Sequence, residues 1–236
     1  MANYTELTSC RVSKEEDLVD ILDLGNQKLT GVFPRPEDEV GTGPLELVWS
    51  PSSYLVQLKH TYELSEMYGD NYGYLSSLNN SMVQHLNQKA DYLKDVADLQ
   101  EGDVVVDIGS NDGTFLKALP TYTKRIGIDP TIKKFGHYYP AEISKVAEFF
   151  SKESYLSAES EKNAKLVTSI SCFYDLPDPV AFVKDIREIL TDDGVWHFEQ
   201  AYLPSTIRAN SYDTVCHEHL EYYSMLAVRK ILDLAG

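Results

Sequence analysis

The side chains best suited to chemistry are gathered in one short segment, residues 212–223. Two histidines, His217 and His219, flank Glu218 there. Imidazole titrates near neutral pH, so a histidine with a carboxylate neighbour is a natural general base. Alternate residues of an extended segment share one face, so the same residues could instead bind a metal ion. A hydrogen-bonded polar loop without a ligand is a third interpretation, and the spacing alone leaves all three open.

The second chemical feature is a glycine-containing loop. An apolar run leads into Asp107, Gly109, Asn111 and Gly113. Glycine lets a ligand approach the backbone closely, and asparagine tolerates left-handed backbone angles. The GxGxxG dinucleotide pattern is not met, because Asn111 and Thr114 stand at the second and third glycine positions. An acidic residue before the glycines would repel a pyrophosphate, so the loop favours a ligand that carries a cationic amine.

Three further candidates end the next two predicted strands. Asp129 stands where a carboxylate can accept both hydroxyls of a ribose. Glu148 and Phe149 are candidates for contact with an adenine, although Phe149 could equally belong to the core. A ligand with a cationic amino-acid end and a ribose is S-adenosylmethionine, which we expect as the cofactor, with S-adenosylhomocysteine as its product. The run DIGSNDG resembles the first motif of class I methyltransferases and Asp129 their second; a glycine turn without a ligand is the alternative.

Strand-like and helix-like segments alternate from residue 103 onward. This alternation predicts βαβ units and a mostly parallel, doubly wound α/β sheet, whose ligand crevice lies beyond the carboxyl ends of the strands. We expect the loop 107–113 and the segment 212–223 at that end. Strands are predicted at 104–109, 125–130, 143–150, 164–171 and 195–203, helices at 114–119 and 179–190, and a turn at 191–194.

The chain divides into three regions in this interpretation. Residues 1–58 form a small β-rich module with strands at 19–29, 45–49 and 54–58 and a loop at 35–44. Residues 59–100 form a connector and an amphipathic helix at 81–98, with Ser81 near its N-cap. Residues 101–236 form the cofactor-binding core. The connector is an aromatic link or a lid over a pocket, and it carries Tyr62, Tyr68, Tyr72 and Tyr74 beside Gly69 and Gly73.

Composition excludes several classes of protein. The 236 residues include 37 acidic and 21 basic side chains, a net charge of −16 at pH 7. Nucleic-acid binding needs a cationic surface, so we expect no nucleic-acid partner. No apolar run is long enough for a membrane span, and no signal peptide is visible. Three dispersed cysteines, Cys10, Cys172 and Cys216, fit a reducing cytoplasm rather than a disulfide framework.

Four segments together resemble the sugar C-methyltransferases of deoxysugar pathways, over essentially the whole chain. They are LDLGNQKLTGVFP (22–34), MYGDNYGYLSS (67–77), FEQAYLP (198–204) and SYDTVCHEHLEYYS (211–224). The resemblance implies methylation of a carbon next to the ketone of a nucleotide-linked 4-keto-6-deoxy sugar. It also implies that His219 is the base and Glu218 its orienting partner, and that Tyr72 and Tyr74 reach the active site. His217 is a further catalytic candidate of the same block.

The chain departs from that family in three places. The family carries a zinc module built from two CxxC pairs, whereas here the matching positions are Cys10, Ser13, Ser50 and Ser53. Serine does not replace thiolate in a structural zinc site, so we expect no zinc. Cys216 stands where the family often has tyrosine. The family also continues through two more strands and a further domain.

The short core leaves alternatives for partners and activity. The strand at 195–203 would lack its usual neighbour, and an open strand edge needs a cover. We expect that cover to be a second copy of the chain, residues 201–236, or a partner protein. The second hypothesis is therefore a cofactor-binding half-enzyme or non-catalytic subunit that needs a partner. A methyltransferase for another small acceptor, such as an oxygen nucleophile, is a third.

Overall fold

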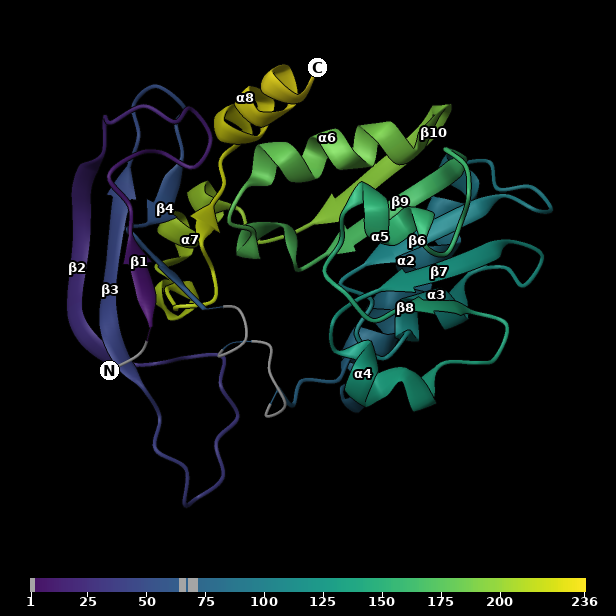
Figure 1. Cartoon of the computed structure of the whole chain (residues 1–236), viewed down its shortest axis with the longest axis horizontal. Coiled ribbons are helices and arrows are strands. Elements are labelled where there is room, and N and C mark those ends of the chain that lie inside the picture. Colours follow the sequence, from purple (N-terminus) through teal and green to yellow (C-terminus); the bar gives the residue numbers. More distant parts are fainter. Residues whose placement is uncertain (1–2, 64–66, 68–71) are drawn as a thin grey trace. The chain divides into compact units, whose positions relative to one another are not determined.

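The computed structural model describes residues 3–63, 67 and 72–236, which form two compact units (Figure 1). The parallel-sheet unit comprises residues 74–172 and 184–199. The antiparallel-sheet unit comprises residues 1–73, 173–183 and 200–236. Helix α6 (Pro179–Ile189) begins in the antiparallel-sheet unit and ends in the parallel-sheet unit. No helix among the described residues is both long and apolar enough to cross a membrane.

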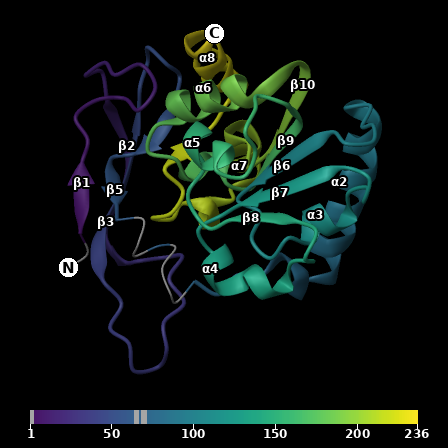
Figure 2. The ribbon, with the colours of Figure 1, turned by 45° about the vertical axis from the view of Figure 1, so that its right-hand side comes forward.

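The parallel-sheet unit is built on a five-stranded sheet in the order β10-β9-β6-β7-β8, with every pair parallel (Figure 2). This is the predicted Rossmann-like parallel sheet, and that prediction is confirmed. The strands are β6 (Val104–Ile108), β7 (Lys124–Ile128), β8 (Ser144–Val146), β9 (Ala164–Ile170) and β10 (Leu190–Glu199). Two helices precede β6, η1 (Ser76–Leu78) and α2 (Asn80–Val96). Between the strands lie α3 (Thr114–Ala118), α4 (Ile132–Phe135), η2 (Gly136–Tyr138) and α5 (Lys152–Leu156).

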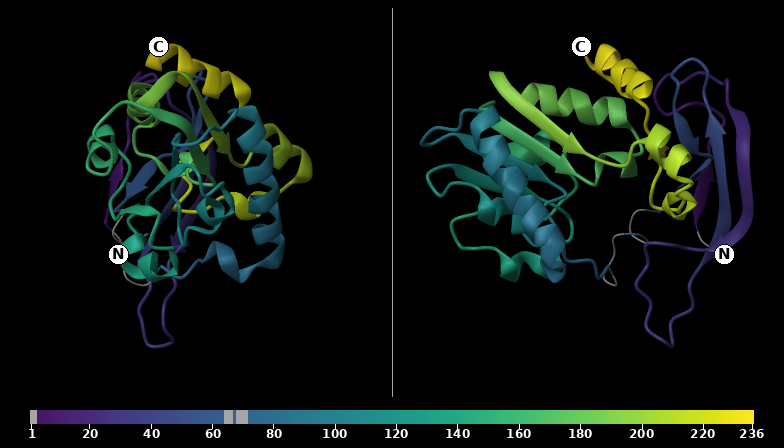
Figure 3. Two further views of the ribbon diagram at one scale, coloured as in Figure 1. Left: turned by 90° about the vertical axis from the view of Figure 1, so that its right-hand side faces the viewer. Right: turned by 180° about the vertical axis from the view of Figure 1, so that it is seen from behind.

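The candidate cofactor loop follows β6, the central strand of this sheet. All five residues of β6 are buried, as expected for a parallel strand covered on both faces. Helix α2 lies along one face (Figure 3), and its apolar residues Leu86, Ala90 and Leu93 join Val105 and Phe115 in one core cluster. The packed centre holds the end of β6, and therefore the following loop, in place.

Four local predictions are wrong. Asn79, not Ser81, caps α2, because its side chain accepts from the Ser81 backbone N–H at 2.9 Å. The predicted turn 191–194 belongs to β10, whose ladder with β9 pairs at Leu190, breaks, and resumes at Val195. Strand β8 ends at Val146 rather than at residue 150, and β3 (Thr42–Trp49) starts inside the predicted loop 35–44.

The antiparallel-sheet unit joins both ends of the chain. Its four-stranded sheet has the order β11-β4-β3-β2, and a separate pair is formed by β1 and β5. The strands are β1 (Tyr4–Glu6), β2 (Val19–Lys28), β3, β4 (Val56–Leu58), β5 (His60–Tyr62) and β11 (Glu221–Tyr222). The remaining elements are η3 (Phe173–Asp175), α7 (Leu203–Ala209), η4 (Tyr212–Thr214) and α8 (Met225–Ala235).

Strand β11 is the element that connects the catalytic candidates to this sheet. Glu221 pairs with Gln57 and Tyr222 with Val56 in an antiparallel ladder. Leu220 and Tyr222 are buried in the core cluster formed by Leu45, Leu47, Val56 and Leu58. The segment 216–219 immediately precedes β11, so the sheet fixes one end of it.

Candidate cofactor loop and active site

The loop after β6 has the backbone that its sequence predicts. Gly109, Asn111 and Gly113 all have left-handed φ angles, of +72°, +50° and +73°. Glycine adopts such angles freely and asparagine more readily than most residues. The loop therefore folds sharply between β6 and α3, at the carboxyl end of β6.

Asp107 is the buried acid at the start of this loop. The Thr168 hydroxyl, from the neighbouring strand β9, donates to its Oδ1 at 2.7 Å. Burial raises the pKa of Asp107 to about 7; the Thr168 hydrogen bond opposes that rise and the charge of Asp129 adds to it. A carboxylate held this close to neutrality gains from a cationic ligand, which would favour its ionised form.

Asp129 links the second strand to the loop. Its Oδ2 accepts from the Asn111 N–H at 2.8 Å, and its Oδ1 accepts from the Thr131 N–H at 2.6 Å. Burial raises its pKa against these hydrogen bonds. The Thr131 hydroxyl also donates to Oδ1, at 2.5 Å. Each carboxylate oxygen offers two acceptor positions, so one position, on Oδ2, is left for a ribose hydroxyl.

Tyr139 is a loop-positioning residue that sequence reasoning missed. Its hydroxyl donates to the Asn111 carbonyl oxygen at 2.9 Å and lies 2.8 Å from Ser110 Oγ. A Cβ atom at Gly113 or at Gly127 would lie 2.9 Å from the Tyr139 ring, closer than real Cβ contacts allow. The ring therefore explains both glycines. Its position after α4, far along the chain from the loop, gave no local signal.

The two adenine candidates lie just beyond β8. Glu148 and Phe149 are both exposed, and Phe149 keeps half of its surface accessible. Phe149 is thus not a core residue, the alternative considered for it. Their role at the cofactor stays a prediction.

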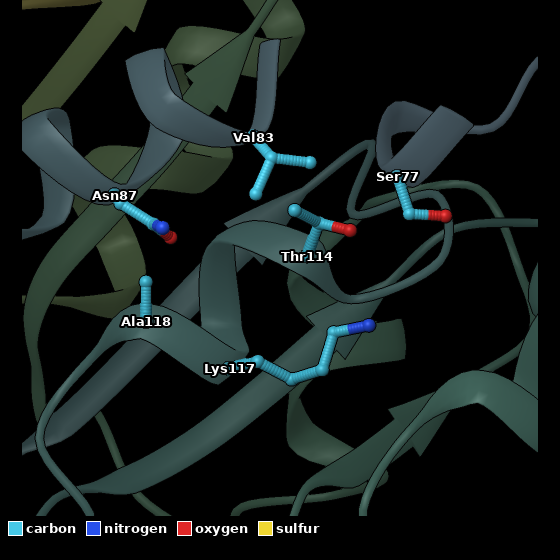
Figure 4. Close-up of a pocket in the computed structure, with 6 residues that line it drawn as sticks. All are labelled: Ser77, Val83, Asn87, Thr114, Lys117 and Ala118. Carbon is cyan, nitrogen blue, oxygen red and sulfur yellow. The ribbon is translucent and has the colours of Figure 1, made fainter. Parts of the chain in front are cut away.

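A pocket of about 250 Å³ lies between α2 and the first turns of α3 (Figure 4). The six side chains that line it include none of the predicted cofactor residues. They are Ser77, Val83, Asn87, Thr114, Lys117 and Ala118.

His219 is held in one orientation within the antiparallel-sheet unit. Its Nδ1 lies 3.0 Å from the Thr214 carbonyl oxygen, and the Tyr174 ring packs 4.3 Å from the imidazole, centre to centre. A carbonyl oxygen only accepts, so Nδ1 carries the hydrogen and the neutral ring has its lone pair on Nε2. Burial lowers the pKa of His219, although the Thr214 carbonyl and Glu218 oppose this. A neutral imidazole with a free lone pair is the form that a base requires.

Glu218 is positioned from the N-terminal module, through Thr30. The Thr30 hydroxyl accepts from the His217 N–H at 2.8 Å and donates to Glu218 Oε2 at 2.8 Å. Gly31, with φ of +76°, lies against the same carboxylate: a Cβ there would approach Glu218 Cδ to 2.7 Å. Thr30 was not singled out from the sequence, although it lies within the segment 22–34.

The His217 side chain contacts Thr30, in the N-terminal module, and Tyr62, in the connector. It is fully buried, with Nδ1 3.3 Å from the Thr30 N–H nitrogen, and its ring packs edge-on to Tyr62 at 4.9 Å. Burial lowers its pKa. We propose that His217 holds the segment 216–219 in position and that His219 contacts the substrate.

One group of three side chains is close enough together to bind a metal ion. Among the residues that the structure describes, Cys216, Glu218 and His219 have ligand atoms within 4.8 Å of one another, and His217 is not part of that group. Burial and the Glu218 charge raise the pKa of the Cys216 thiol. Metals bind the thiolate, so a metal ion bound here would have to displace the proton that these surroundings favour.

The tyrosine candidates fall in both units. Tyr72, in the antiparallel-sheet unit, packs edge-on to Phe33 at 5.5 Å. Tyr74 opens the parallel-sheet unit, and its carbonyl oxygen accepts from Asn111 Nδ2 at 3.0 Å, beside the cofactor loop. Tyr68 and Gly69 lie outside the described residues. The cofactor candidates thus share the parallel-sheet unit, while His217, Glu218 and His219 share the other.

Comparison with known proteins decides the family. A family model described as "methyltransferase domain" matches residues 82–236, and one described as "putative zinc binding domain" matches residues 10–68. The chain belongs to the methyltransferase-domain family. Membership of this family agrees with the S-adenosylmethionine cofactor expected from the loop and Asp129.

Two known proteins show what this chain is similar to. The C-methyltransferase NovU of Streptomyces niveus is 29% identical over 235 residues, which cover 98% of this chain and 56% of NovU. The chain thus spans little more than half the length of that curated relative. The solved structure of the plantazolicin methyltransferase BamL, in complex with a triazolic desmethylPZN analog and SAH, is similar in fold. Its TM-score is 0.51 with 16% identity, covering 68% of this chain and 65% of BamL.

Proposed function

We propose that this chain is an S-adenosylmethionine-dependent C-methyltransferase that acts next to the ketone of a nucleotide-linked keto-deoxysugar, with His219 as the base. The observation that carries the proposal is the Nδ1 contact of His219 with the Thr214 carbonyl, which leaves Nε2 as the proton acceptor. The similarity to a C-methyltransferase supports carbon as the acceptor atom. The sugar class rests on the resemblance of the segments 22–34, 67–77, 198–204 and 211–224.

The chemistry needs only a proton acceptor and a positioned electrophile. His219 Nε2 takes the proton from the carbon beside the ketone, and the electron pair of that bond forms an enolate. S-adenosylmethionine supplies the electrophilic methyl carbon when bound. Glu218 stabilises the imidazolium that forms, since its carboxylate is held beside the ring. Tyr72 and Tyr74 are proposed to line the substrate side.

The cofactor is proposed to bind along the loop after β6. Asp107 would face the amino-acid end, and Asp129 would accept a ribose hydroxyl. Gly109, Asn111 and Gly113 supply the backbone that lets the ligand approach, and Glu148 with Phe149 would contact the adenine.

A pH-dependence of cofactor binding follows from Asp107. Below its pKa of about 7 the side chain is neutral and must lose its proton before it can pair with the ligand's ammonium group. We expect the affinity for S-adenosylmethionine to rise about tenfold per pH unit from pH 5 to 6, and to flatten near pH 7. Calorimetric titrations across this range would measure it.

Two variants make that titration decisive. Asp107→Asn should bind weakly, with no rise over the same range. Thr168→Val removes the hydrogen bond that favours the carboxylate, so its profile should move to higher pH. A wild-type affinity that is constant from pH 5 to 7 would contradict the role of Asp107.

The proposed reaction is tested with methyl-¹³C S-adenosylmethionine and a nucleotide-linked 4-keto-6-deoxyhexose. We expect the label on a sugar carbon adjacent to the ketone, which carbon NMR distinguishes from an oxygen-bound methyl. A label on oxygen would replace carbon methylation with transfer to an oxygen nucleophile.

The half-enzyme interpretation is the second candidate, and the place of β10 favours it. Within the described residues β10 pairs with β9 alone, at the edge of the sheet, and no strand of residues 201–236 pairs with it. Labelled product formed only after a second protein is added would support this candidate over an enzyme that acts alone.

A further inference from the structure

Four small side chains of the N-terminal module meet where a zinc-binding module would place its ligands. Residues 10 and 13 and residues 50 and 53 have the paired three-residue spacing of such sites, within the matched range 10–68. Of these four residues only Cys10 carries a thiol. Its Sγ lies 3.1 Å from Ser53 Oγ, across 43 residues of chain. The two turns are therefore in contact through the ligand positions themselves.

Hydrogen bonds around Cys10 follow the pattern of a metal-binding turn. The N–H groups of Val12 and Ser13 point at Cys10 Sγ, at 3.4 Å and 3.5 Å. Cys10 is completely buried. Hydrogen bonds from Ser13, Ser50 and Ser53 lower the pKa of its thiol although burial opposes them. The backbone of the first turn thus presents two N–H donors to the Cys10 sulfur atom.

The remaining hydroxyls are satisfied by one carboxylate and by each other. Ser50 Oγ donates to Asp17 Oδ1 at 2.8 Å, and the Ser52 N–H donates to Asp17 Oδ2 at 2.8 Å. Ser52 Oγ donates to Ser13 Oγ at 2.8 Å. The cluster is a closed hydrogen-bond network that joins both turns.

These residues do not fit a structural zinc ion. Such sites use four thiolate or imidazole ligands in a tetrahedron, and a neutral serine hydroxyl is a poor substitute. A single thiolate with three hydroxyls lacks both the charge and the softness that the metal requires. The domain described as zinc-binding is thus held by other means in this chain.

We propose that the Cys10–Ser13–Ser50–Ser53 cluster replaces the zinc ion as the cross-link of the N-terminal module, on a backbone that still has the geometry of a four-ligand site. Hydrogen bonds of these side chains link the two turns, as coordinate bonds to a zinc ion would link them in a zinc-binding module. The module therefore folds without metal, and three serine-to-cysteine substitutions suffice to restore a zinc site. The proposal does not depend on the substrate or on the catalytic role of His219.

The test compares the wild-type chain with the triple variant Ser13→Cys, Ser50→Cys, Ser53→Cys. Metal analysis after purification should find no zinc in the wild type and one zinc per chain in the variant. Cobalt should give the variant the visible absorption of a tetrahedral thiolate site and leave the wild type colourless. A chelator should lower the melting temperature of the variant alone.

Matched variants separate the site from thiols in general. In Ser81→Cys, Ser157→Cys, Ser205→Cys the three added thiols are exposed and lie far from Cys10 in the sequence, so stoichiometric zinc and the cobalt spectrum should both be absent. The double variant Ser13→Cys, Ser53→Cys offers three thiols and should still bind cobalt if the triple variant fails to fold. One equivalent of zinc in the wild type, or folded variants that bind neither metal, would overturn the proposal.

Discussion

Replacing His219 by asparagine should reduce methyl transfer by about 10²- to 10⁴-fold, the contribution typical of a positioned general base. Asparagine fills similar space and can still donate to the Thr214 carbonyl, which the imidazole contacts at 3.0 Å. It cannot accept the proton. The loss should therefore appear in kcat, while the affinity for S-adenosylmethionine, whose candidate residues lie in the parallel-sheet unit, stays within about twofold of the wild type.

Two comparisons make this result specific. His137 is an exposed histidine on η2, so His137→Asn should keep wild-type turnover. His219→Ala leaves a space beside Tyr174, and added imidazole should restore part of the lost rate. Full activity in His219→Asn, or a loss explained wholly by weaker cofactor binding, would remove His219 from the reaction.

Replacing Gly31 by alanine should lower turnover about tenfold by displacing Glu218. The new Cβ would approach the Glu218 carboxylate to between 2.7 and 2.9 Å, so the side chain has to move. Movement breaks the 2.8 Å hydrogen bond from the Thr30 hydroxyl. A hydrogen bond to a charged group contributes about 1.5–3 kcal/mol, so its loss is enough to change the position and the charge balance beside His219.

Gly25 provides the matched control. Its φ of +66° is close to the +76° of Gly31, but nothing lies within 4 Å of a Cβ built there. Both alanine variants should lose roughly 1–2 kcal/mol of folding stability from the left-handed backbone. Only Gly31→Ala should also lose turnover. Equal kcat in the two variants would show that the placement of Glu218 does not matter to the chemistry.

The cofactor loop could be predicted because its signals are local. Asp107, Gly109, Asn111 and Gly113 lie within seven residues, and each type reports directly on its backbone angle or charge. The parallel sheet was visible for the same reason, since alternating strands and helices leave a pattern along the chain. Residues 10, 13, 50 and 53 were linked as a set by the resemblance to a family with two CxxC pairs, because three of them are serines in this chain.

Contacts between distant segments could not be predicted in this way. Thr30 reaches Glu218 across 188 residues, and Tyr139 reaches Asn111 across 28. Neither residue type has a pattern that marks it, because threonine and tyrosine are common in ordinary loops. The orientation of His217 into the module, toward Tyr62, is likewise a product of tertiary packing.

Solvent exchange at the substrate carbon tests the central claim most directly. The protein is incubated in deuterium oxide with a nucleotide-linked 4-keto-6-deoxyhexose and S-adenosylhomocysteine, which fills the cofactor site but has no methyl group to transfer. Proton NMR then follows deuterium entering the carbon beside the ketone. The account predicts rapid exchange by the wild type and loss of that exchange in His219→Asn; exchange that persists at the wild-type rate in the variant would contradict it.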